Sequence, residues 1–480
     1  MTTTPDTGAP SPTPIGVATA AAVTSSPPEA NPRRWIIFGV VSMALLMGSI
    51  DQTIVATALP RLQHDLHTTV NWSGWTITAY QLGAVLTLPV AGRIADLYGR
   101  KKVFMICVVI FTVSSLACGM STSIYMLVPL RFIQALGGGA FMPSASGIVA
   151  ENFGKDRDRA IGMFTSIFPL GALIGPVLGG IITQDWTWRG IFFINIPIGV
   201  LLVILGLRIL PSSAPRAAKR PDFAGTALLG VVLISAMYGV TSLGSGKESV
   251  ISVGFLVPEA VAIIFGVLLA RQMRSAENPI IPIRLLRERH FATMNLIALL
   301  YGGTALGFST LVPLYAFQHY HIKIFQAGTV LTARAIGAVM VASITSFLLR
   351  KIGYRIPMVV GFALSAAGLE LLSIAPHGFS TYFWLAFGAL ILGLGGGISA
   401  PATNNAILSF APDQVASISG LRGMFRQIGG MIAIAVTTAI VARSQNEGIA
   451  LGHAFTVFAL VILLVAIPLV YTVPSRRGTW

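Results

Sequence analysis

Two ionisable side chains of opposite charge lie inside long apolar stretches of the sequence. Asp51 is in the apolar run that begins near Trp35, roughly 24 Å along a helix that rises 1.5 Å per residue. Arg131 is in the run that begins near Ile124, roughly 10 Å from its start. A charge inside hydrocarbon is costly unless it is paired, hydrated or neutralised, and a carboxyl can become neutral by taking up a proton. We therefore expect Asp51 and Arg131 to lie at similar depth, to pair, and to couple proton movement to the function.

Each of these residues also has a plainer interpretation. Asp51 could be an acid at a helix end that is wetted by the outer surface. Arg131 could belong to a structural salt bridge that never titrates. A guanidinium cannot lose its charge in a protein, so in either case Arg131 needs an acid, a carbonyl or water.

The composition places these charges in a membrane protein. Of the 480 residues, 54% are hydrophobic and only 10% are charged, which excludes an ordinary soluble globular protein. The net charge of +15 does not indicate nucleic-acid binding, because the basic residues collect in the loops of one side. The two cysteines, Cys107 and Cys118, are predicted to be inert packing residues. No spaced His or Cys set suggests a metal site, no nucleotide-binding domain is present, and we predict no enzyme activity and no cofactor.

The apolar runs predict an all-α polytopic membrane protein with fourteen spans. Their approximate bounds are 35–58, 72–91, 103–120, 124–148, 160–182, 190–209, 223–243, 252–270, 291–316, 325–349, 356–375, 382–408, 418–441 and 452–473. With the N-terminus inside, most Lys and Arg residues fall on the cytoplasmic side. We therefore expect both termini in the cytoplasm and the protein in the plasma membrane.

Two six-helix halves are expected to flank an extra pair of helices. The tripeptide Gly-Met-Phe occurs at 162–164 and at 423–425, at matching places in the two halves. Internal repeats of this kind place a substrate site between the halves, near the middle of the membrane. The predicted divisions are a disordered cytoplasmic tail at 1–33, a six-helix bundle at 34–210, a linker with the extra helices at 211–290, a second bundle at 291–473, and a cytoplasmic tail at 474–480.

Four motifs, in order, resemble those of the major facilitator superfamily, in its branch of fourteen-helix drug:proton antiporters. The loop GRIADLYGRKK at 92–102 resembles the signature loop between helices 2 and 3, with Leu97 at a position that is often basic. Residues 49–60 resemble the helix 1 signature around Asp51, and residues 131–140 resemble the helix 4 motif, with Ala135 in place of its first Gly. Residues 171–180, GALIGPVLGG, resemble the antiporter motif that distinguishes exporters from importers.

The resemblance assigns roles to named residues. The antiporter motif comprises Gly171, Gly175, Pro176, Gly179 and Gly180. The cytoplasmic gate would comprise Gly92, Asp96, Gly99, Arg100, Arg422 and Arg426, with Asp96 closing against the helix that carries the last two; solvated loop charges are the alternative there. The substrate cavity would include Gln134, Tyr301, Tyr315, Gln318, Asn404 and Asn405. Glu370 and Arg334 are expected to form a structural pair.

The function that this resemblance implies is proton-coupled efflux of lipophilic drug-like or antibiotic molecules by alternating access. The implied partners are a small lipophilic substrate, protons and the lipid bilayer, and the protein is expected to be a monomer. Two alternatives stay open. The protein could export an endogenous lipid or secondary metabolite, or it could be a transporter-like sensor that binds ligand without moving it.

Overall fold

A computed structural model describes residues 31–473, apart from 157–159, 162, 165, 213–214, 216–220, 245–248, 278, 282–286, 375–379 and 409–414. The predicted tail at 474–480, residues 1–30 of the tail at 1–33, and the first residue of the repeated tripeptide, Gly162, lie outside the described residues. Every regular element among the described residues is a helix, which confirms the all-α prediction.

The helices of the first half cover the predicted spans up to residue 209. They are α1 (Arg34–Asp65), α2 (Val70–Tyr98), α3 (Arg100–Met120), α4 (Ile124–Gly138), α5 (Phe141–Asn152), the short η1 (Gly154–Asp156), α7 (Ile167–Asp185), α8 (Gly190–Phe193) and α9 (Asn195–Ile209). The following pair is α10 (Phe223–Leu243) and α11 (Val253–Ser275). The second half consists of α13 (Arg289–Tyr320), α14 (Ile324–Ile352), α15 (Arg355–Ser373), α16 (Thr381–Leu408), α17 (Val415–Val441), α18 (Glu447–Val461), the π-helical η3 (Ile462–Ala466) and α19 (Ile467–Tyr471).

Thirteen helices or continuous helix pairs among the described residues are long and apolar enough to cross a membrane. The remaining predicted span coincides with α2, a helix of 29 residues that is not one of the thirteen. Polar residues such as Asn71, Thr76 and Gln81 are buried in α2 against its neighbours, so its sequence is less apolar than its length suggests. The count of fourteen spans therefore stays a prediction that depends on α2.

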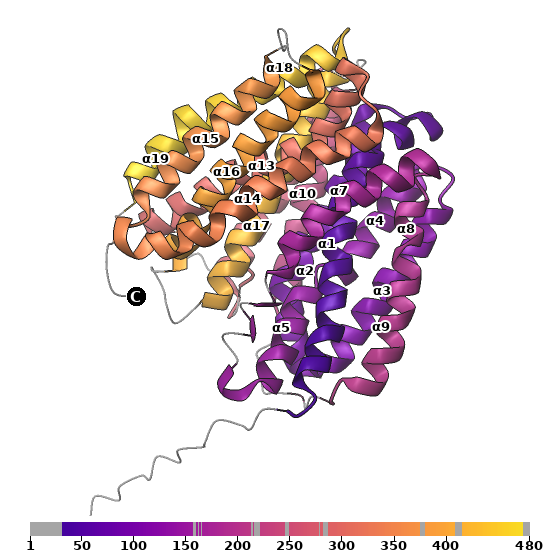
Figure 1. Ribbon diagram of the computed structural model, residues 1–480, viewed down its shortest axis with the longest axis vertical. Helices are drawn as coiled ribbons and strands as arrows, with labels where there is room; N and C mark the ends of the chain where they lie inside the picture. The colour runs from indigo at the N-terminus through magenta and orange to yellow at the C-terminus, as the bar shows by residue number, and fades with distance from the viewer. Residues whose placement is uncertain are drawn as a thin grey trace, which may run out of the picture.

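The two halves are separate bundles that share one region of contact. In Figure 1 the indigo-to-magenta helices α1 to α9 form one bundle and the orange-to-yellow helices α13 to α19 form the other. Helix α10 packs against α2 and α17, at the junction between the bundles, while α11 packs mainly on α10 and is largely exposed. The extra pair therefore adds to the outside of the molecule and does not separate the two bundles.

The bundles touch near one end and diverge toward the other (Figure 1). We call the end that carries Arg100–Lys102 the basic end. Contact between the bundles occurs away from it: a methyl group at Gly180 of α7 would lie 2.9 Å from Phe325 Cα of α14, and one at Gly74 of α2 would lie 3.2 Å from Thr438 Cγ2 of α17. The two bundles are therefore closest to each other away from the basic end.

Two glycines mark corresponding turns at the basic end. Gly99 joins α2 to α3 with φ 92°, and Gly353 joins α14 to α15 with φ 74°. Positive φ values in this range strain residues that carry a Cβ, so glycine is the natural residue at both turns. Glycines with positive φ at matching places in the two bundles are consistent with an internal repeat.

Candidate functional site

Asp51 and Arg131 form an ion pair in the interior of the first bundle. Both side chains are fully buried, and Arg131 Nη1 donates to Asp51 Oδ2 at 2.8 Å. Asp51 lies in the middle of α1 and Arg131 lies in the middle of α4. The contact expected from their similar depths is therefore present. Removing either partner would leave the other charge buried without compensation.

Two amide side chains complete the hydrogen bonding of the carboxylate. Gln134 Nε2 and Asn195 Nδ2 each donate to Asp51 Oδ1 at 2.9 Å. Both amides also donate to Ser115 Oγ, at 2.6 Å from Gln134 and 3.4 Å from Asn195. Every contact to Asp51 is thus from a donor, which suits an ionised carboxylate. A protonated carboxyl would lack the negative charge that strengthens these hydrogen bonds, so protonation would weaken the cluster.

The guanidinium of Arg131 is held by α2 and by two aromatic rings. Its Nε donates to the Thr76 carbonyl at 3.2 Å, and its Nη1 also donates to Gln134 Oε1 at 2.5 Å. Its Cζ lies 4.3 Å from the centre of the Tyr80 ring and 5.4 Å from that of Phe192, within the range of cation–π attraction. Its Nη2 has no hydrogen-bond partner among the described residues. The ion pair therefore connects α1 with helices α2, α3, α4, α8 and α9.

The glycines of the antiporter motif face α1 beside Asp51. Methyl groups at Gly171, Gly175 and Gly179 would overlap Ser49, Thr53 and Thr57, respectively. Both sets recur every four residues, so a small face of α7 lies along a small polar face of α1. Ser49 Oγ also donates to the Phe168 carbonyl of α7 at 2.6 Å. The position of α1, and with it Asp51, therefore depends directly on α7.

The remaining residues of this motif face the second bundle. A methyl group at Gly328 of α14 would lie 2.5 Å from the Pro176 carbonyl, and Gly180 approaches Phe325 of the same helix. Helix α7 is thus packed between α1 and α14. The antiporter motif therefore links the buried ion pair to the contact between the two bundles.

The signature loop forms its own ion pairs at the basic end. Arg100 donates to Asp96 Oδ1 through Nε at 3.1 Å and Nη2 at 2.9 Å. Its Nη1 donates to the Gly147 carbonyl at 2.5 Å and lies 3.4 Å from Glu151 Oε1. Gly92 is near Pro143 of α5, with 3.9 Å between the position of a methyl group and Pro143 Cβ. In this conformation the partner of Asp96 is Arg100 and not a residue of α17.

Arg422 and Arg426 lie in α17 next to a third arginine. Arg422 Nη1 donates to Asn404 Oδ1 of α16 at 3.3 Å. Arg426 interacts electrostatically with Arg422 and with Arg334 of α14, and Tyr301 of α13 interacts with all three. The predicted gate residues therefore form two separate groups, one around Asp96 and one in the second bundle.

The predicted pair of Glu370 and Arg334 is wrong. Arg334 Nη1 donates to Ser309 Oγ of α13, and none of the ion pairs in the described part of the chain includes Arg334 or Glu370. Helix α16 packs extensively against both α14 and α15, which contact each other only weakly. Neighbours in the sequence are thus separated in space by a third helix.

The predicted substrate residues lie in three different environments. Gln134 is fully buried in the Asp51 cluster. Tyr315 is buried and stacks on His319, and Gln318 Nε2 donates to Glu447 Oε2 at 2.5 Å near the end opposite the basic end. Asn405 Nδ2 donates to the Pro401 carbonyl within its own helix at 3.0 Å. Only Tyr301 and Asn404 adjoin the arginines of the second bundle.

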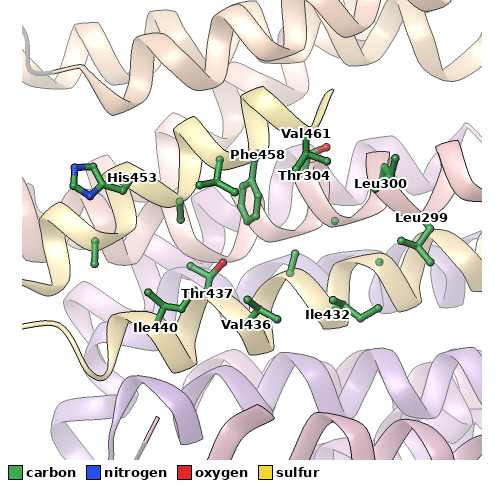
Figure 2. Close-up of a pocket in the computed structure, with 16 residues that line it drawn as sticks. Leu299, Leu300, Thr304, Ile432, Val436, Thr437, Ile440, His453, Phe458 and Val461 are labelled. Atoms are coloured by element: carbon green, nitrogen blue, oxygen red, sulfur yellow. The ribbon is translucent and has the colours of Figure 1, made fainter. Parts of the chain in front are cut away.

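Two apolar cavities contain none of the predicted substrate residues. Figure 2 shows one of about 310 Å³ between α13, α17 and α18, lined by residues such as Leu300, Val436 and Phe458, with His453 at one end. The other, of about 780 Å³, lies between α2, α3, α4 and α10. Apolar walls of this kind suit lipophilic molecules. Neither cavity includes a residue of α1 or α16, so neither is the cavity that the sequence predicts.

A family model described as the Major Facilitator Superfamily matches residues 41–434 and 294–479. The chain belongs to this superfamily. Its fold agrees with solved members: the nucleoside transporter NupG superposes with a TM-score of 0.67 at 12% identity, covering 92% of this chain and 100% of that one. The inward-open xylose transporter XylE of E. coli gives a TM-score of 0.65 at 13% identity, covering 93% and 98%. These likenesses show the fold alone.

Sequence relatives are named as drug transporters. The chain is 29% identical over 423 residues to Multidrug resistance protein 3 of Bacillus subtilis, covering 86% of this chain and 81% of the relative. It is 30% identical over 419 residues to Multidrug transporter protein MdtP of the same organism, covering 86% and 76%. It is 29% identical over 422 residues to the Tetracenomycin C resistance and export protein of Streptomyces glaucescens, covering 86% and 77%. This superfamily member is thus a multi-pass membrane transporter related to drug exporters and not an enzyme.

Proposed function

We propose that this protein exports lipophilic drug-like or antibiotic molecules in exchange for protons, by alternating access across the plasma membrane. The observation that carries this proposal is the fully buried ion pair of Asp51 and Arg131. Of its two members, only the carboxylate can become neutral by taking up a proton, whereas the guanidinium keeps its charge, so we assign Asp51 as the proton carrier and Arg131 as its fixed counter-ion. The three relatives reported above, all named for drug resistance, drug transport or antibiotic export, support a drug-like substrate.

Protonation of Asp51 and movement of the bundles are coupled through α1 and α7. All three hydrogen bonds to Asp51 come from donors, so protonation removes the negative charge that strengthens them and weakens the contacts that hold α1 in place. The glycine face of α7 transmits a shift of α1 to α14, because α7 contacts both helices closely. Protonation then favours one arrangement of the bundles, and substrate release favours the other.

The basic end is proposed to face the cytoplasm, since Lys and Arg concentrate in cytoplasmic loops. The end at which the bundles diverge then faces inward in this conformation (Figure 1). Cysteines introduced at Thr68 and Ser249 should react with an impermeant maleimide from outside, and one at Ser213 should not. The native Cys107 and Cys118 are buried, which keeps the background low. A protein with twelve spans would place Ser249 inside and exclude this topology.

A drug-susceptibility panel in an efflux-deficient host tests the substrate class. Expression should raise the inhibitory concentration of several lipophilic antibiotics, and inverted vesicles should accumulate the same compounds when a proton gradient is applied. Accumulation distinguishes transport from ligand sensing, because a sensor binds without moving its ligand. An absence of gradient-driven accumulation for every compound that binds would exclude an exporter.

A further inference from the structure

The second bundle gathers three arginines around Tyr301 without an acidic partner. Arg334 comes from α14, and Arg422 and Arg426 come from α17, one helical turn apart. Arg426 interacts electrostatically with both other arginines, and the Tyr301 hydroxyl interacts with all three. We call these three arginines the arginine cluster. It lies in spans of a membrane protein, where charged side chains are rare and mark pathways for ions or substrates.

The contacts that the arginine cluster does make are to neutral groups. Arg334 donates to Ser309 Oγ, and Arg422 donates to Asn404 Oδ1. The Nε atoms of Arg422 and Arg426 are buried without a hydrogen-bond partner among the described residues. The ion pairs of the described chain all lie in the first bundle, so none of them neutralises the cluster. Guanidinium groups keep their charge in proteins, so these three need an anion or water.

Close helix packing fixes where the cluster sits. A methyl group at Gly302 of α13 would overlap the Arg426 carbonyl oxygen, and one at Gly429 of α17 would overlap the Leu299 carbonyl oxygen. The backbones of α13 and α17 are thus in direct contact beside the cluster. Tyr301, on the same turn of α13 as Gly302, has its hydroxyl 2.8 Å from the position of a methyl group at Gly396 of α16. The three guanidinium groups are therefore held by closely packed helices and not by loops.

A ligand can reach the cluster. Arg334, Arg422 and Arg426 are only half-buried, in contrast to the fully buried Arg131 of the first bundle. Arg422 and Arg426 are the eighth and twelfth residues of α17, the helix of the second bundle that packs on α2 of the first. The three guanidinium groups are therefore partly accessible and lie near the junction of the bundles.

We propose that the arginine cluster binds the acidic group of a lipophilic organic anion, such as a carboxylate or sulfonate, and makes such anions preferred substrates. This proposal rests on the export function proposed above. Planar guanidinium groups match carboxylate and sulfonate oxygens with paired hydrogen bonds, and Tyr301 offers a further donor. The arginines do not act in proton exchange, because they do not titrate.

Asp96 is the alternative counter-ion. Closure of the basic end could bring Asp96 from Arg100 to Arg422 or Arg426. Asp96 would then neutralise part of the positive charge of the arginine cluster as an intramolecular counter-ion. The two accounts differ in what the wild-type protein recognises. An intramolecular counter-ion gives no preference for acidic ligands.

The test compares acids with their methyl esters on the purified full-length protein. Nalidixate and fusidate, each against its methyl ester, are titrated by calorimetry into protein in nanodiscs. We expect each acid to bind at least about tenfold more tightly than its ester, the effect of a charge-assisted hydrogen bond. Arg426→Gln should reduce this preference, and binding of the ester by the variant shows that it is folded. Arg443→Gln, at an exposed position beyond the other end of α17, should keep the preference.

Two results would overturn the proposal. One is equal binding of acid and ester by the wild-type protein, which needs no variant to interpret. The other is a preference for acids that appears only in Asp96→Asn, which would make Asp96 the counter-ion. The anion site and the export function can fail independently. Binding of acids that depends on Arg426, without any transport, would contradict the export function alone. Export of neutral compounds, without a preference for acids, would contradict the anion site alone.

Discussion

The two bundles differ in whether their buried charged side chains have a partner of opposite charge. In the first, Asp51 and Arg131 are both fully buried, in contact at 2.8 Å, and surrounded by amides that complete the hydrogen bonds of the carboxylate. In the second, Arg334, Arg422 and Arg426 are half-buried, and Arg334 and Arg422 donate to the neutral side chains of Ser309 and Asn404. A closed, neutral pair and an open, uncompensated cluster are suited to different tasks.

This difference suggests a division of labour. A group that exchanges protons must be able to change its charge, and the first bundle holds a carboxylate whose hydrogen bonds weaken when it is protonated. A group that binds an anion must keep its charge, and guanidinium groups do so. On this view the first bundle couples transport to protons and the second selects the substrate.

Arg131→Ala should give the largest effect, because it leaves Asp51 buried without a counter-ion. Breaking a buried pair costs about 3–5 kcal/mol, and we expect a matching loss of thermal stability in detergent. Arg61→Ala is the matched control, since Arg61 pairs with Asp65 with half of its side chain exposed. A surface pair contributes about 0–1 kcal/mol. Equal losses in the two variants would show that the Asp51–Arg131 pair has no special role in stability.

Arg131→Lys should fold and still lose most transport. A lysine retains the charge but cannot reproduce the three hydrogen bonds that Arg131 makes to Asp51, Gln134 and the Thr76 carbonyl. Transport in proteoliposomes should fall about tenfold or more, as expected for the loss of hydrogen bonds to charged groups. Full activity in Arg131→Lys would mean that charge alone suffices.

Gly175→Ala tests the link between the bundles. The added methyl group overlaps Thr53, so α1 and α7 must separate, at a cost of about 1–3 kcal/mol. We expect the variant to fold and to transport more slowly. Gly266→Ala is the control, because nothing lies within 4 Å of a methyl group at that position of α11. Unchanged transport in Gly175→Ala would show that this close contact does not matter for coupling.

Asp96→Asn should give the smallest effect. Its ion pair with Arg100 is partly exposed and of a kind that contributes about 0.2–1 kcal/mol, and Arg100 keeps its contacts with Gly147 and Glu151. Substrate binding should persist, while the rate of switching between inward and outward states changes a few-fold. Stopped-flow uptake over a range of proton gradients measures this. A rate equal to that of the wild-type protein at every gradient would identify Asp96 as a solvated loop acid.

The helices and the central ion pair could be predicted because their signals are local. Long apolar runs specify spans, and the positions of Asp51 and Arg131 along their runs give depths that agree. The polar partners Ser115 and Asn195 were missed, although each is a hydrogen-bonding residue within a predicted span. Ser115 and Asn195 could have been identified as polar residues at the depth of Asp51 that face the interior. That direction can be assigned only when the neighbouring helices are known.

The arrangement of the second bundle could not be predicted in the same way. The sequence suggested that Arg334 and Glu370 pair because their helices follow one another, but α16 lies between α14 and α15. Gln134 was expected in a substrate cavity, and the structure places it in the buried cluster because its turn of α4 faces α1. The depth of a residue in the membrane follows from its position along one helix, whereas the direction in which its side chain points depends on how several helices pack.

The most direct test of the central claim is substrate efflux against an imposed proton gradient in proteoliposomes, for the wild-type protein and Asp51→Asn. Asp51→Asn removes the counter-ion of Arg131, but Asn195 and Gln134 can still hydrogen-bond an amide at this position, and retained substrate binding is the control for folding of the variant. We predict that wild-type efflux rises with the gradient, whereas efflux by Asp51→Asn is the same at every gradient. Gradient-driven efflux that persists in Asp51→Asn would show that the proton travels by another residue.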